Sequence, residues 1–488
     1  MATREIELKF LCQPADLETV LAASSGTVIR TKPLRATYFD TPELALTKAQ
    51  ASLRLREGEG CRLQTLKRGT GLVREEVETP APADGLDLEL PALRRMLGPK
   101  DRARLQPIFS VTVTRRVTDI LYQGASIELA LDEGEVTSGD HRQAICEVEL
   151  ELKSGPVSAL FGLARDLSGA APLYLSLEGK AVRGAALHAG TETKPRRGLA
   201  PHLPRHPSGQ VAFQAVTQDL LGQIAANSLL LRQGHGGEAI HALRRSIRRL
   251  RCVLSAFRPM VEDEAFEALQ LGFKAVMAAS DAARDLDVFA QDNADLGLAA
   301  PNFGAQVEAA RALATAQATA AVSDQVFRDL LLKAAAWIET GSWLALEGKA
   351  RLRRAGPARD LAVRALMRRW HRTLKPGPKV SDLSPPDRHS LRLEGKKLRY
   401  ALEAVAPLFD GRRCGAFLRR LKVLQDELGH LNDQAVAHRI VERLNPKGVA
   451  RVEARRLLKA REANSRKILK RAENAMQMLV SRAVPWET

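Results

Sequence analysis

Five short segments near the N-terminus alternate charged and apolar side chains, and this spacing constrains the fold more than any other feature. The first contains Glu5, Glu7 and Lys9, each separated from the next by one apolar residue. Because successive side chains of a β-strand point to opposite faces, these three would share one face. Similar segments contain Arg54 and Arg56; Arg74, Glu76 and Glu78; Glu128 and Asp132; and Glu147, Glu149 and Glu151. One such strand is typical of a solvated sheet face, but five strands with both acids and bases favour a barrel with a charged interior.

A charged interior needs a ligand or internal pairing. Burying these charges costs free energy unless they pair with each other or with a charged ligand. Carboxylate oxygens suit Mg²⁺ or Mn²⁺, and Lys and Arg side chains bind phosphate oxygens. The pattern therefore indicates a phosphate polyanion bound together with metal ions.

The net charge is unevenly distributed along the chain. The 488 residues carry +17, yet residues 1–200 contain 27 basic and 27 acidic side chains, so the excess lies in the remainder. This asymmetry predicts two modules, the second of which meets a polyanion: nucleic acid, an anionic membrane or polyphosphate. Aromatic residues make up only 4%, which weighs against nucleic acid because single-strand binders stack bases on aromatic rings.

The sequence shows neither a membrane signal nor a disulfide framework. No apolar run is long enough to span a bilayer, and the chain begins with a strand pattern rather than a signal peptide. The five scattered cysteines lack metal-ligand spacing and are interpreted as reduced thiols. We therefore expect a cytoplasmic protein without a membrane partner.

Composition shifts predict the domain boundaries. Residues 1–189 contain short strand patterns, 190–209 are dense in Pro and Gly and predict a linker, and 210–482 have helical spacing almost throughout. The helical part is duplicated, with halves at about 210–375 and 385–482. We expect a multidomain chain, with an N-terminal α+β region built on an antiparallel barrel and a C-terminal all-α region of duplicated helical bundles.

The duplication preserves a basic stripe. At helical spacing, one face of each half carries, respectively, His241, Arg244, Arg248 and Arg251, and His389, Arg392, Lys396 and Arg399. A solvated helix face is the ordinary interpretation of such a run. However, 241–251 contains no acid to pair at helical spacing, and the self-repulsion is rebuilt in the second half. We therefore favour a bound polyanion at both stripes.

The N-terminal motifs resemble the CYTH domain of the triphosphate tunnel metalloenzymes. They are Glu5-x-Glu7-x-Lys9, Tyr38-Phe-Asp-Thr-Pro42, Leu53-Arg-Leu-Arg56, Gln64-Thr-Leu-Lys67 and Cys146-Glu-Val-Glu-Leu-Glu151. The resemblance implies an eight-stranded antiparallel tunnel that binds a triphosphate with divalent metal. It implies Glu5, Glu7, Asp132, Glu147 and Glu149 as ligands for Mg²⁺ or Mn²⁺, and Glu5, Glu7, Lys9, Glu147 and Glu149 as catalytic residues.

The resemblance also implies which basic residues grip the phosphates. They are Lys9, Arg54, Arg56, Lys67, Arg74, Arg116, Lys180 and Arg183. Strand parity selects Arg116, because Arg115 shares a face with the apolar Val111 and Val113; Arg115 remains the alternative. Lys67 shares a face with Leu63, so its assignment depends on the motif alone.

The C-terminal motifs resemble the CHAD domain, a helical module associated with polyphosphate binding. They include both basic stripes, Arg284-Asp-Leu-Asp-Val-Phe289 and Leu421-Lys-Val-Leu-Gln-Asp-Glu-Leu-Gly-His-Leu-Asn-Asp433. The resemblance implies that the eight stripe residues bind long-chain polyphosphate. The leading hypothesis is metal-dependent hydrolysis of inorganic triphosphate beside a polyphosphate-binding module. The alternatives are an adenylate cyclase, a thiamine or nucleoside triphosphatase on the same tunnel, or a non-catalytic polyphosphate-binding protein.

Overall fold

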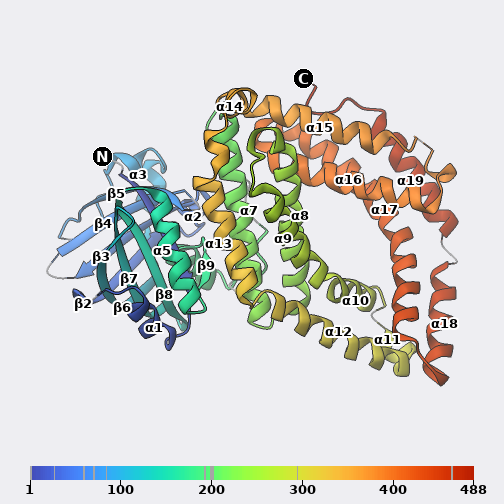
Figure 1. Ribbon diagram of the computed structural model, residues 1–488, viewed down its shortest axis with the longest axis horizontal. Coiled ribbons are helices and arrows are strands. Elements are labelled where there is room, and N and C mark those ends of the chain that lie inside the picture. The colour runs from blue at the N-terminus through green and yellow to red at the C-terminus, as the bar shows by residue number, and fades with distance from the viewer. Residues whose placement is uncertain are drawn as a thin grey trace. The chain divides into compact units, whose positions relative to one another are not determined.

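The computed structural model describes residues 3–26, 28–58, 61–69, 72–83, 85–191, 194–197, 203–293, 295–377, 379–462 and 465–487 (Figure 1). The chain divides into two compact units. The barrel unit contains Met1–Arg196, Leu221–Leu230 and Asp324–Gly341, and the helical unit contains Arg197–Leu220, Leu231–Ser323 and Ser342–Thr488. Within the described ranges, no helix is long and apolar enough to cross a membrane.

The barrel unit is built on one antiparallel sheet. Its strands are β1 (Thr3–Leu11), β2 (Arg30–Asp40), β3 (Ala51–Gly58), β4 (Cys61–Arg68), β5 (Val73–Pro80), β6 (Gln106–Tyr122), β7 (Ala125–Ser138), β8 (His141–Ser154) and β9 (Tyr174–Ser176). The order is β5-β4-β3-β2-β6-β7-β8-β1-β9, and β5 also pairs with β1. This additional pairing connects the first and last of eight strands, so the sheet curves into a barrel-like tunnel. The predicted fold class of this region is confirmed.

Short helices pack against this sheet. They are α1 (Asp16–Ala23), α2 (Ala45–Lys48), α3 (Pro91–Arg94), α4 (Pro99–Arg102), α5 (Val157–Ala170) and α6 (Lys180–His188). The apolar side chains of β3 and β4 face outward, where Leu53 and Leu66 pack with Leu46, Leu93 and Leu97. Their charged neighbours consequently face inward. A helix from much later in the chain, α13 (Gln325–Thr340), packs on α5 and β9 within this unit.

Helix α6 fills one end of the barrel interior with apolar side chains. Ala185 and Leu187 of α6 belong to one buried cluster with Val111 and Val113 of β6 and Tyr38 of β2. A Cβ added at Gly184 would lie 2.2 Å from the Phe109 ring, so the absence of a side chain allows α6 to approach β6 closely. The inward face of β6 is therefore apolar beside α6 and charged farther along the strand.

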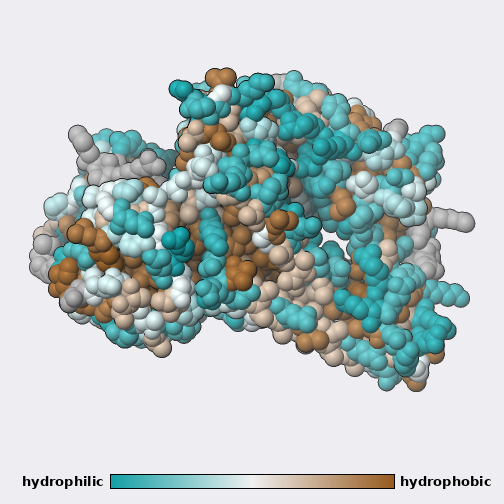
Figure 2. Space-filling model, in the orientation of Figure 1, coloured by the Kyte–Doolittle hydropathy of each residue, from teal (hydrophilic) through white to brown (hydrophobic). Residues whose placement is uncertain are grey.

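The remaining helices are α7 (Gly209–Arg232), α8 (Gly236–Val261), α9 (Phe266–Ala279), α10 (Asp281–Gln291), α11 (Leu296–Ala299), α12 (Pro301–Ala321), α14 (Lys349–Ala355), α15 (Ala358–Leu374), α16 (Pro385–Val405), α17 (Gly411–Leu444), α18 (Gly448–Glu462) and α19 (Ser465–Val480), with short 3-10 turns at Ser342–Ala345, Val380–Asp382 and Ala406–Leu408. In the helical unit, contacts run from α8 to α16, α17, α18, α12, α10 and back to α8. These helices form a ring around an opening that Figure 2 shows within this unit. The predicted all-helical class is confirmed.

The two basic stripes lie on α8 and α16, which pack against each other. The apolar side of α8 is fully buried: Leu243 and Ile247 have no exposed surface and Leu250 is 1% exposed. On α16, Leu391 and Leu398 are equally buried. This burial fixes the rotation of both helices and brings their basic stripes near each other.

Candidate active site and polycation cluster

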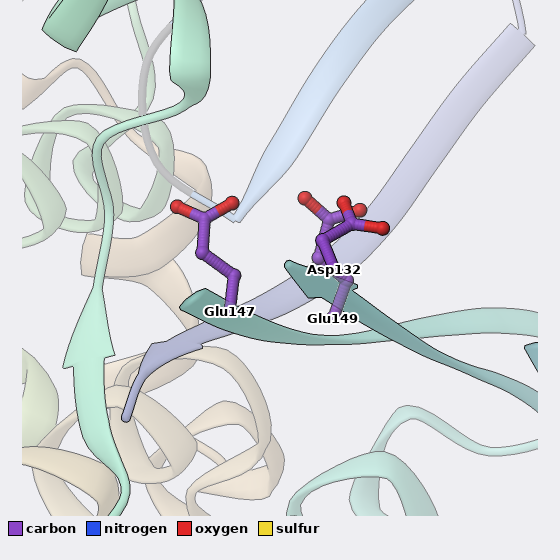
Figure 3. Close-up of side chains that lie close together, drawn as sticks. All are labelled: Asp132, Glu147 and Glu149. Atoms are coloured by element: carbon purple, nitrogen blue, oxygen red, sulfur yellow. The ribbon is translucent and has the colours of Figure 1, made fainter. Parts of the chain in front are cut away.

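Three carboxylates meet inside the barrel. Asp132 of β7 lies opposite Glu147 of β8 in the sheet register, and Glu149 follows on the same face of β8. Each residue offers one ligand oxygen, and these oxygens lie within 4.8 Å of one another. Figure 3 shows the carboxylates on the same side of the two neighbouring strands. Asp132 and Glu147 have no exposed surface, so this acidic cluster is buried.

Basic side chains neutralise the acidic cluster. The Lys180 ammonium lies 2.7 Å from Asp132 and 2.6 Å from both Glu147 and Glu149. Arg115 donates to Asp132 at 2.6 Å and to Glu149 at 2.5 Å. The cluster is thus held by a helix residue from α6 and by a strand residue from β6. Two further contacts complete it: Lys9 lies 2.7 Å from Glu149, and Arg183 pairs with Glu147.

These contacts keep the cluster ionised. Burial alone would raise the pKa of Glu149, but Lys180, Lys9 and Arg115 hold that pKa well below its ordinary value. Burial also opposes ionisation of Asp132, yet Lys180 and Arg115 lower its pKa. For Lys180 itself, burial would lower the pKa, and the neighbouring carboxylates raise it instead. The interior therefore contains fixed charges of both signs.

A second charged group lies along β1, β3, β4 and β5. Lys67 donates to Glu5 at 2.7 Å and lies 3.2 Å from Glu76. Arg54 lies 3.7 Å from Glu76, and burial raises the pKa of that carboxylate. Two more pairs extend the group: Arg56 with Glu78 at 3.2 Å, and Glu7 with Lys9 at 3.7 Å. Lys9 touches Glu149 as well, so the two groups adjoin.

The structure corrects one placement made from strand parity. Arg116 points away from the acidic cluster and pairs with Glu18 of α1 at 2.6 Å, whereas Arg115 reaches Asp132 and Glu149. Strand parity alone assigns the face that carries Val111 and Val113 to the outside of the barrel. That face is the interior, and its apolar residues pack beside α6.

The other predicted tunnel residues lie in these two groups, except that the side chain of Arg74 lies outside the described part of the structure. Glu76 and Glu78 also belong to the site, and their place in an alternating segment is the sequence signal that could have identified them. Lys67 faces the interior with Thr65, which has no exposed surface and donates to Glu78 at 2.9 Å. The family motif thus located a side chain that parity did not support.

The acidic cluster fits a divalent metal ion. Its three carboxylates are hard oxygen donors close enough to contact one cation, which is what Mg²⁺ and Mn²⁺ require. The Lys180 ammonium now contacts all three, so these oxygens already surround a positive charge. Asp132, Glu147 and Glu149 are therefore the residues that would hold such an ion.

The helical unit contains a cluster of basic side chains that we call the polycation cluster: Arg248, Arg284, Arg392, Lys396 and Arg399. It combines α8, α10 and α16. Arg284 pairs with Asp285 at 2.9 Å and Arg399 with Glu403 at 3.4 Å. For the other three members, no acidic partner lies within 4 Å in the described ranges. Arg392 is only 7% exposed, and its buried Nε lacks a hydrogen-bond partner among the described residues.

The other stripe residues make internal contacts. Arg244 is 2% exposed and donates to the Met277 carbonyl at 2.6 Å and to Ser280 at 2.8 Å, which ties α8 to the end of α9. Arg251 donates to Gln270 at 3.3 Å. The two histidines have partners as well: His241 lies 2.9 Å from Asp287, and His389 lies 3.1 Å from Asn432. The predicted stripe thus contains residues with internal partners, among them Arg399, and three cations, Arg248, Arg392 and Lys396, without an acidic partner among the described residues.

Comparisons with known proteins agree with both units. The CYTH domain model matches residues 3–185, and the CHAD domain model matches residues 215–442. An inorganic triphosphatase from Haemophilus influenzae is 32% identical over 197 residues, which are 38% of this chain and 55% of that protein. The chain therefore matches about half the length of this curated relative.

A solved structure resembles the C-terminal part. The crystal structure of the CHAD domain from the plant Ricinus communis is 25% identical, with a TM-score of 0.53, and the match covers 60% of this chain and 98% of that one. The two domain models together account for the barrel, with its charged interior, and for the helices of the polycation cluster. The chain thus contains one segment that matches the CYTH domain and a second segment that matches the CHAD domain.

Proposed function

We propose that the barrel hydrolyses inorganic triphosphate with the help of Mg²⁺ or Mn²⁺. The observation that carries this proposal is the interleaving of the acidic cluster with Lys180, Arg115 and Lys9 at 2.5 to 2.7 Å. A site for a bare polyanion needs bases alone, while buried carboxylates among the bases suit an anion that arrives with cations. The similarity to an inorganic triphosphatase supports the same substrate.

In this proposal, the acidic residues of the barrel bind the metal ion and the basic residues bind the phosphates. Asp132, Glu147 and Glu149 would hold the cation, which would supply Lewis-acid neutralisation of phosphate charge. Lys180 and Arg115 can then turn from the carboxylates toward phosphate oxygens, because both kinds of oxygen accept the same hydrogen bonds. This exchange of partners keeps every buried charge compensated. The bases stabilise the negative charge that develops on the leaving phosphate.

The second charged group extends the phosphate path. Lys67 and Arg54 flank Glu76, and Lys9 connects them with the acidic cluster. A chain of three phosphates can therefore contact basic side chains along several strands while Glu5 and Glu7 supply further oxygen donors. The two groups together fit a short linear phosphate better than a single phosphate ion.

The experiment is a phosphate-release panel with Mg²⁺, with Mn²⁺ and with a chelator. The substrates are triphosphate, pyrophosphate, ATP, thiamine triphosphate and long-chain polyphosphate. We expect metal-dependent release from triphosphate that Glu147→Gln and Glu5→Gln abolish and that Glu18→Gln, on the outside of the barrel, leaves unchanged. Conversion of ATP to a cyclic product, or full turnover in Glu147→Gln, would refute the proposal.

We also propose that the helical unit binds long-chain polyphosphate at the polycation cluster. Five cations from three helices meet there, three of them without an acidic partner in the described chain. Such an arrangement repels itself unless an anion is bound. The test is binding to immobilised polyphosphate at moderate salt. Glutamate substituted for Arg248 should weaken retention strongly, and unchanged retention would show that the cluster is a solvated surface.

A further inference from the structure

One position distinguishes the two copies of the basic stripe. His241 matches His389, Arg244 matches Arg392, and Arg251 matches Arg399, but Arg248 matches Lys396. An arginine guanidinium stays protonated in proteins, whereas a lysine amine can lose its proton when it is buried beside other cations. The second half therefore has a cation that can lose its proton, Lys396, where the first half has a permanently charged one, Arg248.

The surroundings of Lys396 are almost entirely basic. Arg392 and Arg399 lie on the same helix, at helical spacing that brings them to the same side. Arg248 of α8 and Arg284 of α10 act on the amine from the two other helices of the cluster. In the described part of the chain, no carboxylate lies within ion-pair distance of Lys396. Burial, and then repulsion by these arginines, lowers the pKa of Lys396 to about 7.

The remaining helices packed on α16 carry charges that engage other partners. Asp433 of α17 acts on Arg392. Arg369 of α15 lies 3.4 Å from Glu394, and Lys397 donates to the same Glu394 at 2.5 Å. Lys397 is thus a lysine one residue away with an acidic partner and 43% side-chain exposure. It provides a matched control.

We propose that the helical unit takes up a proton at Lys396 when it binds polyphosphate, so that the affinity for the polymer depends on pH. This inference rests on the polyphosphate binding proposed above. A bound phosphate chain places negative charge beside the amine and offsets the repulsion by the four arginines. The ammonium form then becomes the favoured one. The polycation cluster consequently carries its full positive charge only when Lys396 is protonated, and its affinity for polyphosphate falls as the pH rises.

The first experiment measures binding of long-chain polyphosphate by calorimetry in two buffers with different heats of ionisation. Between about pH 6 and about pH 8, we expect affinity to fall about tenfold, with uptake of about one proton per site at the higher pH. In Lys396→Arg this proton uptake and most of the pH dependence should disappear. This substitution introduces the side chain that stands at the matched position of α8, Arg248. Lys397→Arg should behave like the wild type.

The histidines of the stripes provide the main competing explanation. Histidine is the side chain type whose charge ordinarily changes in this pH range, and the histidines of both stripes remain in Lys396→Arg. If the variant keeps the full proton uptake, the histidines carry it and the inference is refuted. If wild-type protein binds polyphosphate with no proton uptake, the inference fails while the proposed function stands. Absence of binding at about pH 6 refutes both.

A measurement on the wild-type chain avoids dependence on the variant. Competitive acylation of amines followed by peptide mapping reports the protonation of each lysine. Without polymer, the acylation of Lys396 should reach half of its maximum rate near neutral pH. This midpoint lies well below the midpoint expected for exposed lysines. With saturating polyphosphate, this midpoint should rise by at least one pH unit. A midpoint that does not move would contradict the inference.

Discussion

Removal of Lys180 is the sharpest test of the interior of the barrel. Its ammonium contacts Asp132, Glu147 and Glu149 at 2.6 to 2.7 Å, and its side chain is only 10% exposed. Lys180→Met keeps the length of the side chain but leaves buried carboxylates undercompensated. Breaking a buried charge pair in this way costs about 3 to 5 kcal/mol. Opening of β7 and β8 should become correspondingly easier, by a factor on the order of a hundred or more.

Hydrogen exchange followed by mass spectrometry on peptides of β7 and β8 measures this opening without interference from the helical unit. Peptides of α8 serve as an internal reference, and Lys100→Met, an exposed lysine of the same unit, serves as the control. Mn²⁺ should restore protection far more in Lys180→Met than in the wild type, since a cation can replace the ammonium among the carboxylates. Unchanged exchange in Lys180→Met, or no effect of Mn²⁺, would refute the reasoning.

Three further outcomes are expected. Arg115→Gln should raise the KM for triphosphate about tenfold or more through loss of a charged hydrogen-bond donor, while Arg116→Gln should leave steady-state kinetics unchanged; equal effects would contradict the placement of Arg115. The basic neighbours of Glu149 hold the pKa of this carboxyl below its ordinary value. Its ionisation therefore stabilises the fold fully above about pH 4.5. Acid titration followed by circular dichroism should show this contribution disappearing as the pH falls below about 4. Raising the salt concentration should weaken polyphosphate retention steeply in the wild type and less in Arg248→Gln, and equal slopes would argue against contact with Arg248.

The alternating strands predicted most of the charged interior because a β-strand has a strict period of two. The same rule misplaced Arg116, because it assumes that one face is apolar along its whole length. In β6 the interior face changes from apolar to charged near the first turn of α6, and no local pattern in β6 indicates where a helix that begins at Lys180 will pack. Lys180 and Arg183 illustrate the same limit, since only the resemblance to a known motif connected them with the strands.

In the helical unit, too, some features could be predicted from the sequence and others could not. Periodicity predicted that α8 and α16 each carry a basic stripe, and on α8 the neighbouring apolar residues Leu243 and Ile247 are fully buried. Periodicity could not predict which stripe cations find partners, because Arg244 donates to a carbonyl on another helix. Arg284 was visible only as part of a motif, although it belongs to the polycation cluster. Partners that come from other helices are set by tertiary packing, which a single helix does not encode.

The apolar side chains between α6 and the sheet affect which end of the barrel a phosphate chain can use to reach the acidic cluster. Among the described residues, Tyr38, Val111 and Leu187 fill that end, so the phosphate chain of the proposed reaction should enter and leave by the opposite end. If that is the only entrance, the proposed site would act on the end of a phosphate chain and not along its length. Products would therefore have to depart before the next substrate arrives, so that inorganic phosphate should compete with triphosphate for the same entrance.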